Sequence, residues 1–189
     1  MIDPASVAYD IDGVVADTMK LFIEIARDEF NIKGIRYKDI TSYSLEECLK
    51  IDRQILEDIS DKIVNGNYNG SLEPIKGSAE VLRRICRHNI QILFVTARPT
   101  SDHIQNWLFK YLDIKPDLIQ VIATGTYEGK VDVLLENRMK YFVEDRLETC
   151  FLLEKSGIVP ILFQQPWNRE KHPFLEIKNW KEFEGLMEF

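Results

Sequence analysis

Two aspartates separated by one residue are the strongest chemical signal in this chain. Asp10 and Asp12 follow an apolar run typical of a buried strand, and Gly13 comes directly after them. Carboxylates this close repel each other unless a cation, a proton or a reacting group lies between them. A turn beginning at Asp12 would bring its carboxylate toward that of Asp10. Three interpretations follow: a Ca²⁺ loop, a polar strand end without chemistry, or a Mg²⁺-assisted nucleophile with a partner acid.

Later polar residues help to separate these interpretations. A Ca²⁺ loop would need more oxygen ligands and a glutamate at its twelfth position, which are missing here. Thr96 ends a second apolar run, Glu144 and Asp145 end a third, and Lys130 lies in a connection between them. Taken alone, Thr96 is typical of a helix cap and Lys130 of a solvated surface. Together these residues would supply a nucleophile, a proton donor, two phosphate-binding groups and charge for a metal ion.

The elements that must position these residues alternate between strands and helices. After the first strand, we predict strands at 90–95, 118–123, 141–143 and 159–163. The predicted helices of this part cover 78–88, a segment capped by Thr100, 131–136, 148–156 and 180–187. Such alternation predicts an α/β fold with a doubly wound, Rossmann-like and mainly parallel sheet. The carboxyl ends of its strands would gather the candidate residues at one edge.

Residues 18–74 differ from the rest because they predict helices and no strand. Apolar residues recur at helical spacing after Met19, a capping-box pattern begins at Ser44, and a further helix ends near Gly66. The pattern therefore predicts two parts, a core of residues 1–17 and 75–189 and a small helical cap of residues 18–74. An insertion directly after the first strand would lie over the candidate site.

Composition limits the partners. The chain has 189 residues, 29% of them charged, and a formal net charge of −7, which disfavours a nucleic-acid polymer. The three scattered cysteines are typical of a reducing compartment. The amino terminus resembles neither a signal peptide nor a membrane span, so we expect a cytoplasmic protein without a membrane partner. The oligomeric state stays undetermined, and a homodimer is compatible with the sequence.

The order of the motifs resembles the haloacid dehalogenase (HAD) superfamily of phosphohydrolases. The matching stretches are Asp10-Ile11-Asp12-Gly13-Val14, Leu93-Phe94-Val95-Thr96, Lys130 and Phe142-Val143-Glu144-Asp145. The resemblance implies that Asp10 attacks phosphorus to form an aspartyl-phosphate and that Asp12 acts as general acid and base. It implies phosphate binding by Thr96, Ala97 and Lys130. It also implies Mg²⁺ held by Asp10, the Asp12 carbonyl and Asp145, with Glu144 acting through water.

A narrower resemblance concerns the substrate. Residues 10–17 and Val143-Glu144-Asp145-Arg146 are similar to the 5'(3')-deoxyribonucleotidases and their bacterial relatives. That family carries an aromatic residue directly after the position of Asp17, where this chain has Thr18, and Phe22 one turn later could fill the space. The resemblance makes Tyr43 a candidate base contact, with Arg98 and Trp167 as further substrate contacts. Each of the three is also consistent with an ordinary structural role.

The leading prediction is a Mg²⁺-dependent phosphomonoesterase acting on (deoxy)nucleoside monophosphates as a 5'-nucleotidase. One alternative within the same superfamily is a phosphatase for sugar phosphates or other small metabolites, because the cap selects the leaving group. A phosphotransferase, which passes the phosphoryl group to an alcohol, is also compatible with these motifs. The alternative of another class is a non-catalytic phosphate-binding protein of the same fold. Its simplest signature would be the loss of Asp10 or Asp12, and both are present.

Overall fold

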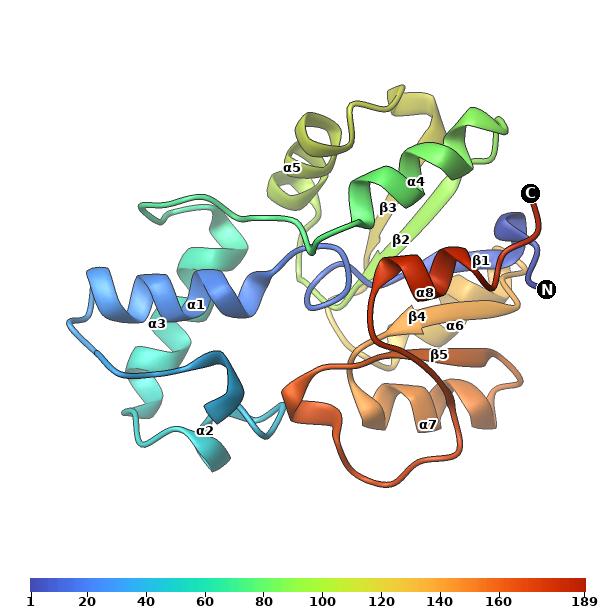
Figure 1. Ribbon diagram of the computed structural model, residues 1–189. Coiled ribbons are helices and arrows are strands. Elements are labelled where there is room, and N and C mark those ends of the chain that lie inside the picture. The colour runs from blue at the N-terminus through green and yellow to red at the C-terminus, as the bar shows by residue number, and fades with distance from the viewer.

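The computed structural model describes all residues from 1 to 189 and contains one six-stranded parallel sheet (Figure 1). The strand order is β3-β2-β1-β4-β5-β6, so that β1 lies inside the sheet beside β2 and β4. The strands are β1 (Val7–Tyr9), β2 (Ile92–Thr96), β3 (Ile119–Ala123), β4 (Tyr141–Glu144), β5 (Val159–Phe163) and β6 (Leu175–Ile177). The chain reverses its direction across the sheet after β3, which is the doubly wound arrangement expected from the sequence.

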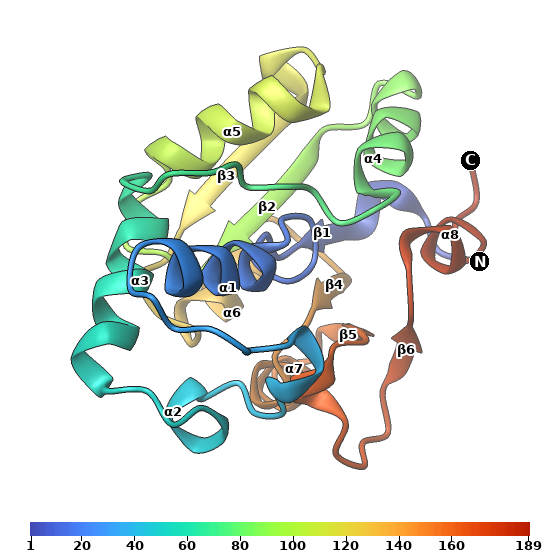
Figure 2. The ribbon, with the colours of Figure 1, turned by 60° about the vertical axis from the view of Figure 1, so that its left-hand side comes forward.

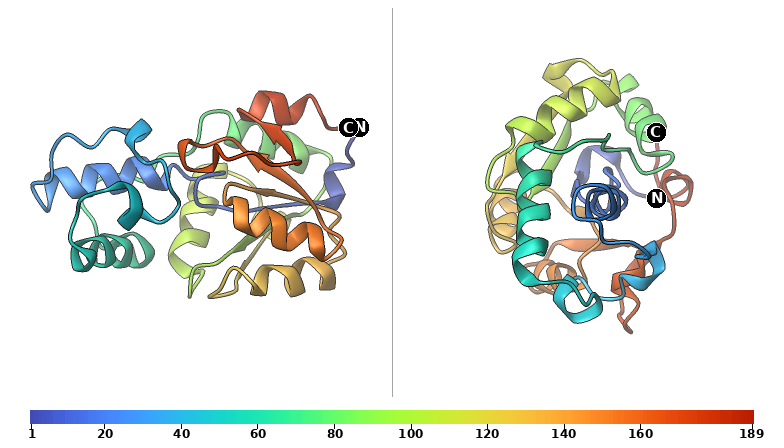
Figure 3. Two further views of the ribbon diagram at one scale, coloured as in Figure 1. Left: turned by 90° about the horizontal axis from the view of Figure 1, so that it is seen from below. Right: turned by 90° about the vertical axis from the view of Figure 1, so that its left-hand side faces the viewer.

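Helices cover both faces of the sheet. They are α4 (Ser78–Arg87), α5 (Asp102–Leu112), α6 (Gly129–Glu136), α7 (Leu147–Lys155) and α8 (Trp180–Glu184). Within β1, Tyr9 packs in a cluster with residues of α4, α5 and α8, whereas Ala8 packs with residues of α6 and α7. Figure 3 shows α4 and α8 above the sheet and α6 and α7 below it. Because both faces are covered, β1 and β2 carry only buried residues.

The segment between β1 and α4 forms the helical part of the molecule. It contains α1 (Thr18–Asp28), α2 (Leu45–Cys48) and α3 (Arg53–Asn65), with α1 packed against α3. These helices lie beyond the carboxyl ends of the central strands (Figures 1 and 2). The two stretches of chain that join this segment to the core lie side by side, because Ala16 pairs antiparallel with Pro74. The N–H of Asp17 donates to the carbonyl of Glu73 at 2.8 Å, which fastens the two stretches together.

Most predicted elements are confirmed within one or two residues at their ends. The predicted strand at 159–163 coincides with β5, and α3 ends at Gly66, whose φ of 72° is easy only for glycine. Two details differ. The N-cap of α5 is Ser101 rather than Thr100, and β6 lies in a part for which no strand was predicted. Short 3₁₀ turns occur at Pro4–Ser6, Tyr37–Asp39, Pro116–Leu118 and Pro166–Asn168. No helix combines the length and apolar character needed to cross a bilayer.

Candidate active site

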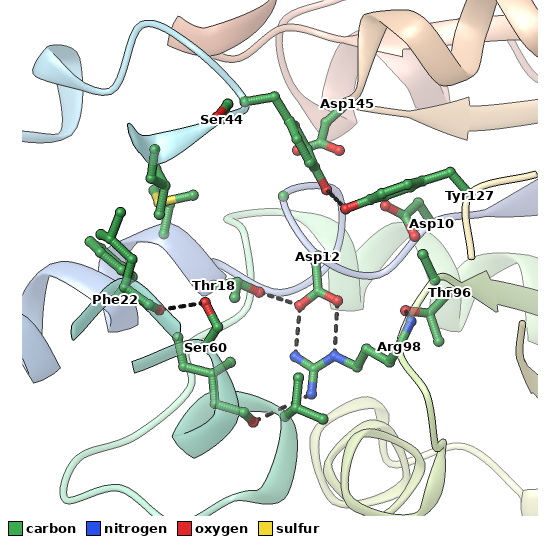
Figure 4. A pocket seen from close by; sticks show the side chains of 18 of the residues that line it. Asp10, Asp12, Thr18, Phe22, Ser44, Ser60, Thr96, Arg98, Tyr127 and Asp145 are labelled. Atoms are coloured by element: carbon green, nitrogen blue, oxygen red, sulfur yellow. Dashed lines mark hydrogen bonds and ion pairs between the residues drawn. The ribbon is translucent and has the colours of Figure 1, made fainter. Parts of the chain in front are cut away.

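The predicted site residues meet in one pocket between the sheet edge and the helical segment. The pocket has a volume of about 530 Å³ (Figure 4). Its wall includes all the predicted site residues except Glu144, namely Asp10, Asp12, Phe22, Tyr43, Thr96, Ala97, Arg98, Lys130, Asp145 and Trp167. The strand ends contribute the charged floor, and α1 and α3 contribute the opposite wall.

Asp10 is placed by the continuation of the β1–β4 ladder. Its N–H donates to the carbonyl of Val143 at 2.9 Å, so its side chain starts from a fixed backbone position at the strand end. The chain then turns at Gly13, which has a φ of 75°. A Cβ atom at this position would lie 2.0 Å from Oδ2 of Asp145, so only glycine fits there. The glycine therefore lets the turn pass directly against the Asp145 carboxylate.

Asp10, Glu144 and Asp145 form a buried cluster of carboxylates. Each offers an oxygen, and these oxygens all lie within 4.8 Å of one another. Both oxygens of Glu144 already have partners, because Oε2 accepts from Lys130 and Oε1 accepts from the backbone N–H groups of Asp145 and Arg146. By contrast, Oδ1 of Asp145 is buried and has no hydrogen-bond partner. The cluster thus leaves Asp10 and Asp145, rather than Glu144, with oxygens free for a cation.

Lys130 crosses the floor of the pocket from the first turn of α6. Its ammonium lies 3.0 Å from Oδ1 of Asp10 and 2.8 Å from Oε2 of Glu144, and its side chain is only 1% exposed. Burial disfavours this charge, but the two carboxylates raise the pKa of Lys130 above its ordinary value. Lys130 is therefore a fixed positive charge beside Asp10.

Two carboxyls of this cluster, those of Asp10 and Asp145, resist ionisation. Burial raises the pKa of Asp10 to about 8, and Lys130 opposes that rise. Burial and the neighbouring Glu144 carboxylate raise the pKa of Asp145 well above its ordinary value. Three buried acids beside one lysine would carry excess negative charge when ionised, which a cation or a proton would neutralise.

Asp12 is turned toward the helical segment. Its carboxylate accepts two hydrogen bonds from the Arg98 guanidinium, at 2.9 Å from Nε and 2.7 Å from Nη2, and a third from the Thr18 hydroxyl (Figure 4). Although burial opposes ionisation, Arg98 lowers the pKa of Asp12 below its ordinary value. Arg98 also donates to the carbonyl of Ile63 in α3. Thr18 therefore contacts a predicted catalytic residue. The sequence showed only that Thr18 stands where the family has an aromatic residue, and it did not predict this contact.

The end of β2 supplies a buried hydroxyl to the pocket. The Oγ1 of Thr96 accepts from the N–H of Arg98 at 3.2 Å and keeps its own hydrogen to donate. Ala97 follows it in the pocket wall, in the short connection that leads to α5. The Thr96 hydroxyl and the backbone N–H of Ala97 are suitable donors for phosphoryl oxygens, because Arg98 already donates its own N–H to Thr96 and Pro99 has none.

The aromatic candidates have different environments. The hydroxyl of Tyr127 donates to that of Tyr43 at 3.2 Å, and the Arg146 guanidinium lies 4.0 Å from the Tyr127 ring centre and 5.1 Å from that of Tyr43. Phe22 lies almost fully buried in α1. Sequence reasoning missed Tyr127, which lies three residues before Lys130, and gave Arg146 no role. Tyr127 shortly precedes the predicted Lys130 and Arg146 directly follows the predicted Asp145, and that proximity in the chain was the available signal.

Trp167 belongs to a loop that contacts the carboxylate cluster directly. Its indole N–H donates to Oδ2 of Asp145 at 3.0 Å, and its ring lies beside that of Tyr37. Next to it, the amide of Asn168 donates to the carbonyl of Asp145 at 2.7 Å. The polar group of Trp167 is therefore engaged within the protein.

The relatives of this chain are nucleotidases. The family model described as 5' nucleotidase, deoxy (pyrimidine), cytosolic type C protein (NT5C) matches residues 4–188. The 5'(3')-deoxyribonucleotidase of Bacillus subtilis (strain 168) is 22% identical over 184 residues, which is 94% of this chain and 95% of the relative. The 5'(3')-deoxyribonucleotidase of Bacillus phage SPbeta matches to the same extent.

Solved structures share the fold. A HAD-superfamily hydrolase from Ehrlichia chaffeensis superposes with a TM-score of 0.57 at 16% identity, over 98% of this chain and 96% of the other. A HAD-superfamily hydrolase, subfamily IA, variant 1, from Geobacter sulfurreducens PCA gives a TM-score of 0.60 at 16% identity, over 95% and 94% of the two chains. Since the family model covers nearly the whole length, this chain belongs to the NT5C family of deoxynucleotidases, which are phosphoric monoester hydrolases with a HAD-type fold.

Proposed function

We propose that this protein is a Mg²⁺-dependent 5'-nucleotidase that hydrolyses (deoxy)nucleoside monophosphates through an aspartyl-phosphate on Asp10. The observation that carries the proposal is the buried cluster of Asp10, Lys130, Glu144 and Asp145 at the floor of a 530 Å³ pocket. The pocket is large enough for a small phosphorylated molecule. Family membership supports the same class of reaction.

The donor set fits Mg²⁺. This ion prefers hard oxygen ligands, and the cluster offers carboxylate oxygens only. The partnerless Oδ1 of Asp145 is the kind of buried atom that a cation would satisfy. Asp10, the carbonyl of Asp12 and Asp145 would hold the ion, with Glu144 fixing Lys130 and reaching the ion through water. When bound, Mg²⁺ would neutralise charge on the phosphoryl group and on the carboxylates.

The reaction would have two steps. In the first, a carboxylate oxygen of Asp10 attacks phosphorus and the bond to the nucleoside oxygen breaks, while Asp12 donates a proton to that oxygen. In the second, Asp12 takes a proton from water, the water oxygen attacks phosphorus, and the bond to Asp10 breaks to release inorganic phosphate. The Arg98 ion pair favours the ionised Asp12 needed in the second step. Proton donation in the first step requires Asp12 to leave Arg98.

Binding of the phosphoryl group would fall to Thr96, Ala97 and Lys130. Thr96 with its hydroxyl, Ala97 with its backbone N–H and Lys130 with its ammonium all line the pocket that holds the carboxylate cluster. Such prearranged donors stabilise charge that develops on the phosphoryl oxygens in the transition state. Lys130 would also reduce the repulsion between Asp10 and the incoming dianion.

We assign selection of the leaving group to the helical cap of residues 18–74. Tyr43 brings a half-buried aromatic ring to the pocket from this segment, and a base can stack on such a ring, whereas the buried Phe22 supports the same wall. The same wall carries the exposed carboxylates of Glu57 and Asp61, which could instead accept hydrogen bonds from a sugar. This second observation keeps a sugar-phosphate phosphatase as the alternative, and the family match favours the nucleotide. The free cysteines fit a cytoplasmic enzyme.

A substrate panel tests the proposal. Phosphate release would be measured for deoxyribonucleotides, ribonucleotides, sugar phosphates and glycerol phosphate, each with Mg²⁺ and with excess chelator. We expect Mg²⁺-dependent release with a preference for deoxynucleotides. Preference for sugar phosphates would retain the chemistry and reject the nucleotide, and no release from any compound would reject the enzyme. A phosphoenzyme that withstands acid quenching and is cleaved by hydroxylamine would identify the aspartyl-phosphate, and transfer to an added alcohol would reveal a phosphotransferase.

A further inference from the structure

The loop between β5 and β6 fastens the end of β4. The amide of Asn168 donates to the carbonyls of Asp145 and Phe163, at 2.7 and 2.9 Å, so it links the last residues of β5 to the residue after β4. Its side-chain oxygen accepts the N–H of Gln165 at 2.9 Å, which closes the loop on itself. Asn168 is 1% exposed. The loop is therefore rigidly attached to the backbone of Asp145.

Trp167 then acts on the side chain of the same residue. Its indole N–H donates to Oδ2 of Asp145 at 3.0 Å, and its side chain is 7% exposed. On the other side of Oδ2, Gly13 approaches so closely that an added Cβ would lie only 2.0 Å from this oxygen and 3.2 Å from the Trp167 ring. Oδ2 is thus held between an indole N–H and a backbone turn. Oδ1 is left buried without any donor.

This arrangement distinguishes the two oxygens of one carboxylate. A carboxylate free to rotate would expose either oxygen, and holding it in one orientation costs conformational entropy when a cation binds. Trp167 removes that freedom in advance. Hydrogen bonds from outer residues to ligating side chains orient the ligands of metal sites, and their loss typically weakens metal affinity by about 10- to 100-fold.

We propose that Trp167 is a positioning residue, which turns the Asp145 carboxylate so that Oδ1 is the oxygen presented to the divalent cation. The inference rests on the proposed function only in requiring that this cluster binds Mg²⁺. It assigns the indole N–H of Trp167 to the metal site, so that this group is not available to donate a hydrogen bond to the substrate.

A second loop contact extends this brace to the helical segment. The amide of Gln165 donates to the carbonyl of Gly13 at 2.7 Å, and its oxygen accepts from the Tyr37 hydroxyl at 3.1 Å. The Tyr37 ring lies 5.9 Å from that of Trp167, between ring centres. The loop therefore contacts the turn after Asp10, the Asp145 carboxylate and the segment that precedes α2.

The chain contains a matched control. Trp180 is also buried, and its indole N–H donates to the carbonyl of Val14 at 2.9 Å, one residue from Gly13. Trp180→Phe and Trp167→Phe each remove one buried indole N–H, which bonds the carbonyl of Val14 in the first case and Oδ2 of Asp145 in the second. Only Trp167→Phe removes a hydrogen bond from a carboxylate of the cluster.

The experiment measures Mg²⁺ binding to the full-length protein without substrate by titration calorimetry. We expect Trp167→Phe to bind Mg²⁺ about 10- to 100-fold more weakly than the unchanged protein, with Trp180→Phe close to the unchanged value. Equal Mg²⁺ affinity in Trp167→Phe, together with a raised KM for nucleotide, would make Trp167 a substrate contact and overturn the inference. If the unchanged protein binds no Mg²⁺, the proposed function fails as well, so the two failures are distinguishable.

A second measurement leaves Trp167 in place and so does not depend on the folding of its variant. The chain has three tryptophans, so Trp107→Phe combined with Trp180→Phe leaves Trp167 as the only indole. We expect a saturable change in its fluorescence on Mg²⁺ addition, with the dissociation constant found by calorimetry. An emission that stays constant while calorimetry reports binding would contradict the contact on which the inference rests.

Discussion

The two walls of the pocket are built on different principles. On the sheet side, Lys130, Glu144 and Asp145 are at most 2% exposed, and each is held by charged or backbone partners. On the helical side, Glu57 and Ser60 of α3 are exposed, and neither depends on the core for its position. Buried groups held by several partners keep a geometry closely, whereas exposed groups on a separately packed segment can change at little cost.

This difference assigns two tasks to two parts of the molecule. In the proposed function, the chemistry common to phosphomonoesters needs atoms fixed to a fraction of an ångström, which the strand ends would provide. Recognition of the leaving group needs a surface that can vary, which the helical segment would provide. Substitutions on the two sides should therefore differ in which parameter they change and in how much they affect stability.

The largest expected effect is that of Asp10→Asn. Removing the nucleophile should lower turnover by at least about 10⁴-fold, as losses of nucleophiles do in other enzymes. The melting temperature should change little, because an amide fills the same volume in a place where the carboxyl resists ionisation. Exposed Asp132, two residues after Lys130, offers the control Asp132→Asn, which should keep full activity. Substantial turnover by Asp10→Asn would remove Asp10 from the mechanism.

Next comes a comparison of ion pairs on the two sides. Lys130→Met should lower the free energy of unfolding by about 3–5 kcal/mol, because it leaves the Glu144 carboxylate buried without its cation. Lys62→Met in α3 breaks a pair with Glu29 whose lysine is 35% exposed, and it should cost less than about 1 kcal/mol. Urea unfolding would measure both. Equal losses of unfolding free energy in the two variants would mean that the buried ion pair of the sheet side contributes no more to stability than the exposed pair of the helical side.

A smaller effect is expected from Tyr43→Ala on the helical side. Loss of a base-stacking ring is worth about 1–3 kcal/mol, which is roughly a 5- to 150-fold fall in kcat/KM for a deoxynucleotide. The same variant should change kcat/KM for glycerol phosphate little, since that substrate has no base. Thr96→Val should instead lower kcat/KM for both substrates. A parallel fall for both substrates in Tyr43→Ala would assign Tyr43 to phosphate positioning or to packing.

The smallest expected effect is a change with pH in how much Mg²⁺ stabilises the protein against thermal unfolding. Asp10, with a pKa of about 8, and Asp145 hold protons in the folded state at pH values where the unfolded chain has lost them. Raising the pH above the ordinary carboxyl range and through the folded pKa therefore destabilises the metal-free protein. Mg²⁺ must displace those protons, so its binding should tighten as the pH rises.

Thermal melting at pH 6 and pH 8.5, with and without Mg²⁺, measures this linkage. Each tenfold gain in Mg²⁺ affinity adds about 1.4 kcal/mol, or about 3–6 °C, so the increment from Mg²⁺ should be larger at pH 8.5. The increment should disappear in Asp145→Asn. A larger increment at pH 6 would contradict the direction of these pKa shifts.

The sheet side was largely predictable from the sequence. Apolar runs that end in polar residues identified the ends of β1, β2 and β4, and parallel pairing places such ends together. β6 was missed because it has only three residues, with Glu176 between Leu175 and Ile177, which is too short for a periodic signal. Lys130 lies outside the strands, and its place on the pocket floor depends on how α6 begins.

The hydrogen bonds that orient the Asp12 and Asp145 side chains could not be predicted from the sequence in this way. Arg98 and Asp12 are 86 residues apart, and Trp167 and Asp145 are 22 apart across an irregular loop. Periodicity reports which face of an element is buried, and it carries no information on how a loop folds back. Thr18 was noticed as a departure from the family pattern, but its hydrogen bond to Asp12 depends on the conformation of the turn after Asp10.

The pairing of Ala16 with Pro74 determines how easily the helical segment between them can be exchanged. The insertion leaves and re-enters through neighbouring, hydrogen-bonded backbones, so its two ends are about as close as paired residues of an antiparallel ladder. A segment whose ends meet in this way can be exchanged for another without altering the register of any strand. Grafting the corresponding segment of a relative between these two residues should therefore transfer substrate preference while the host sheet keeps its catalytic rate.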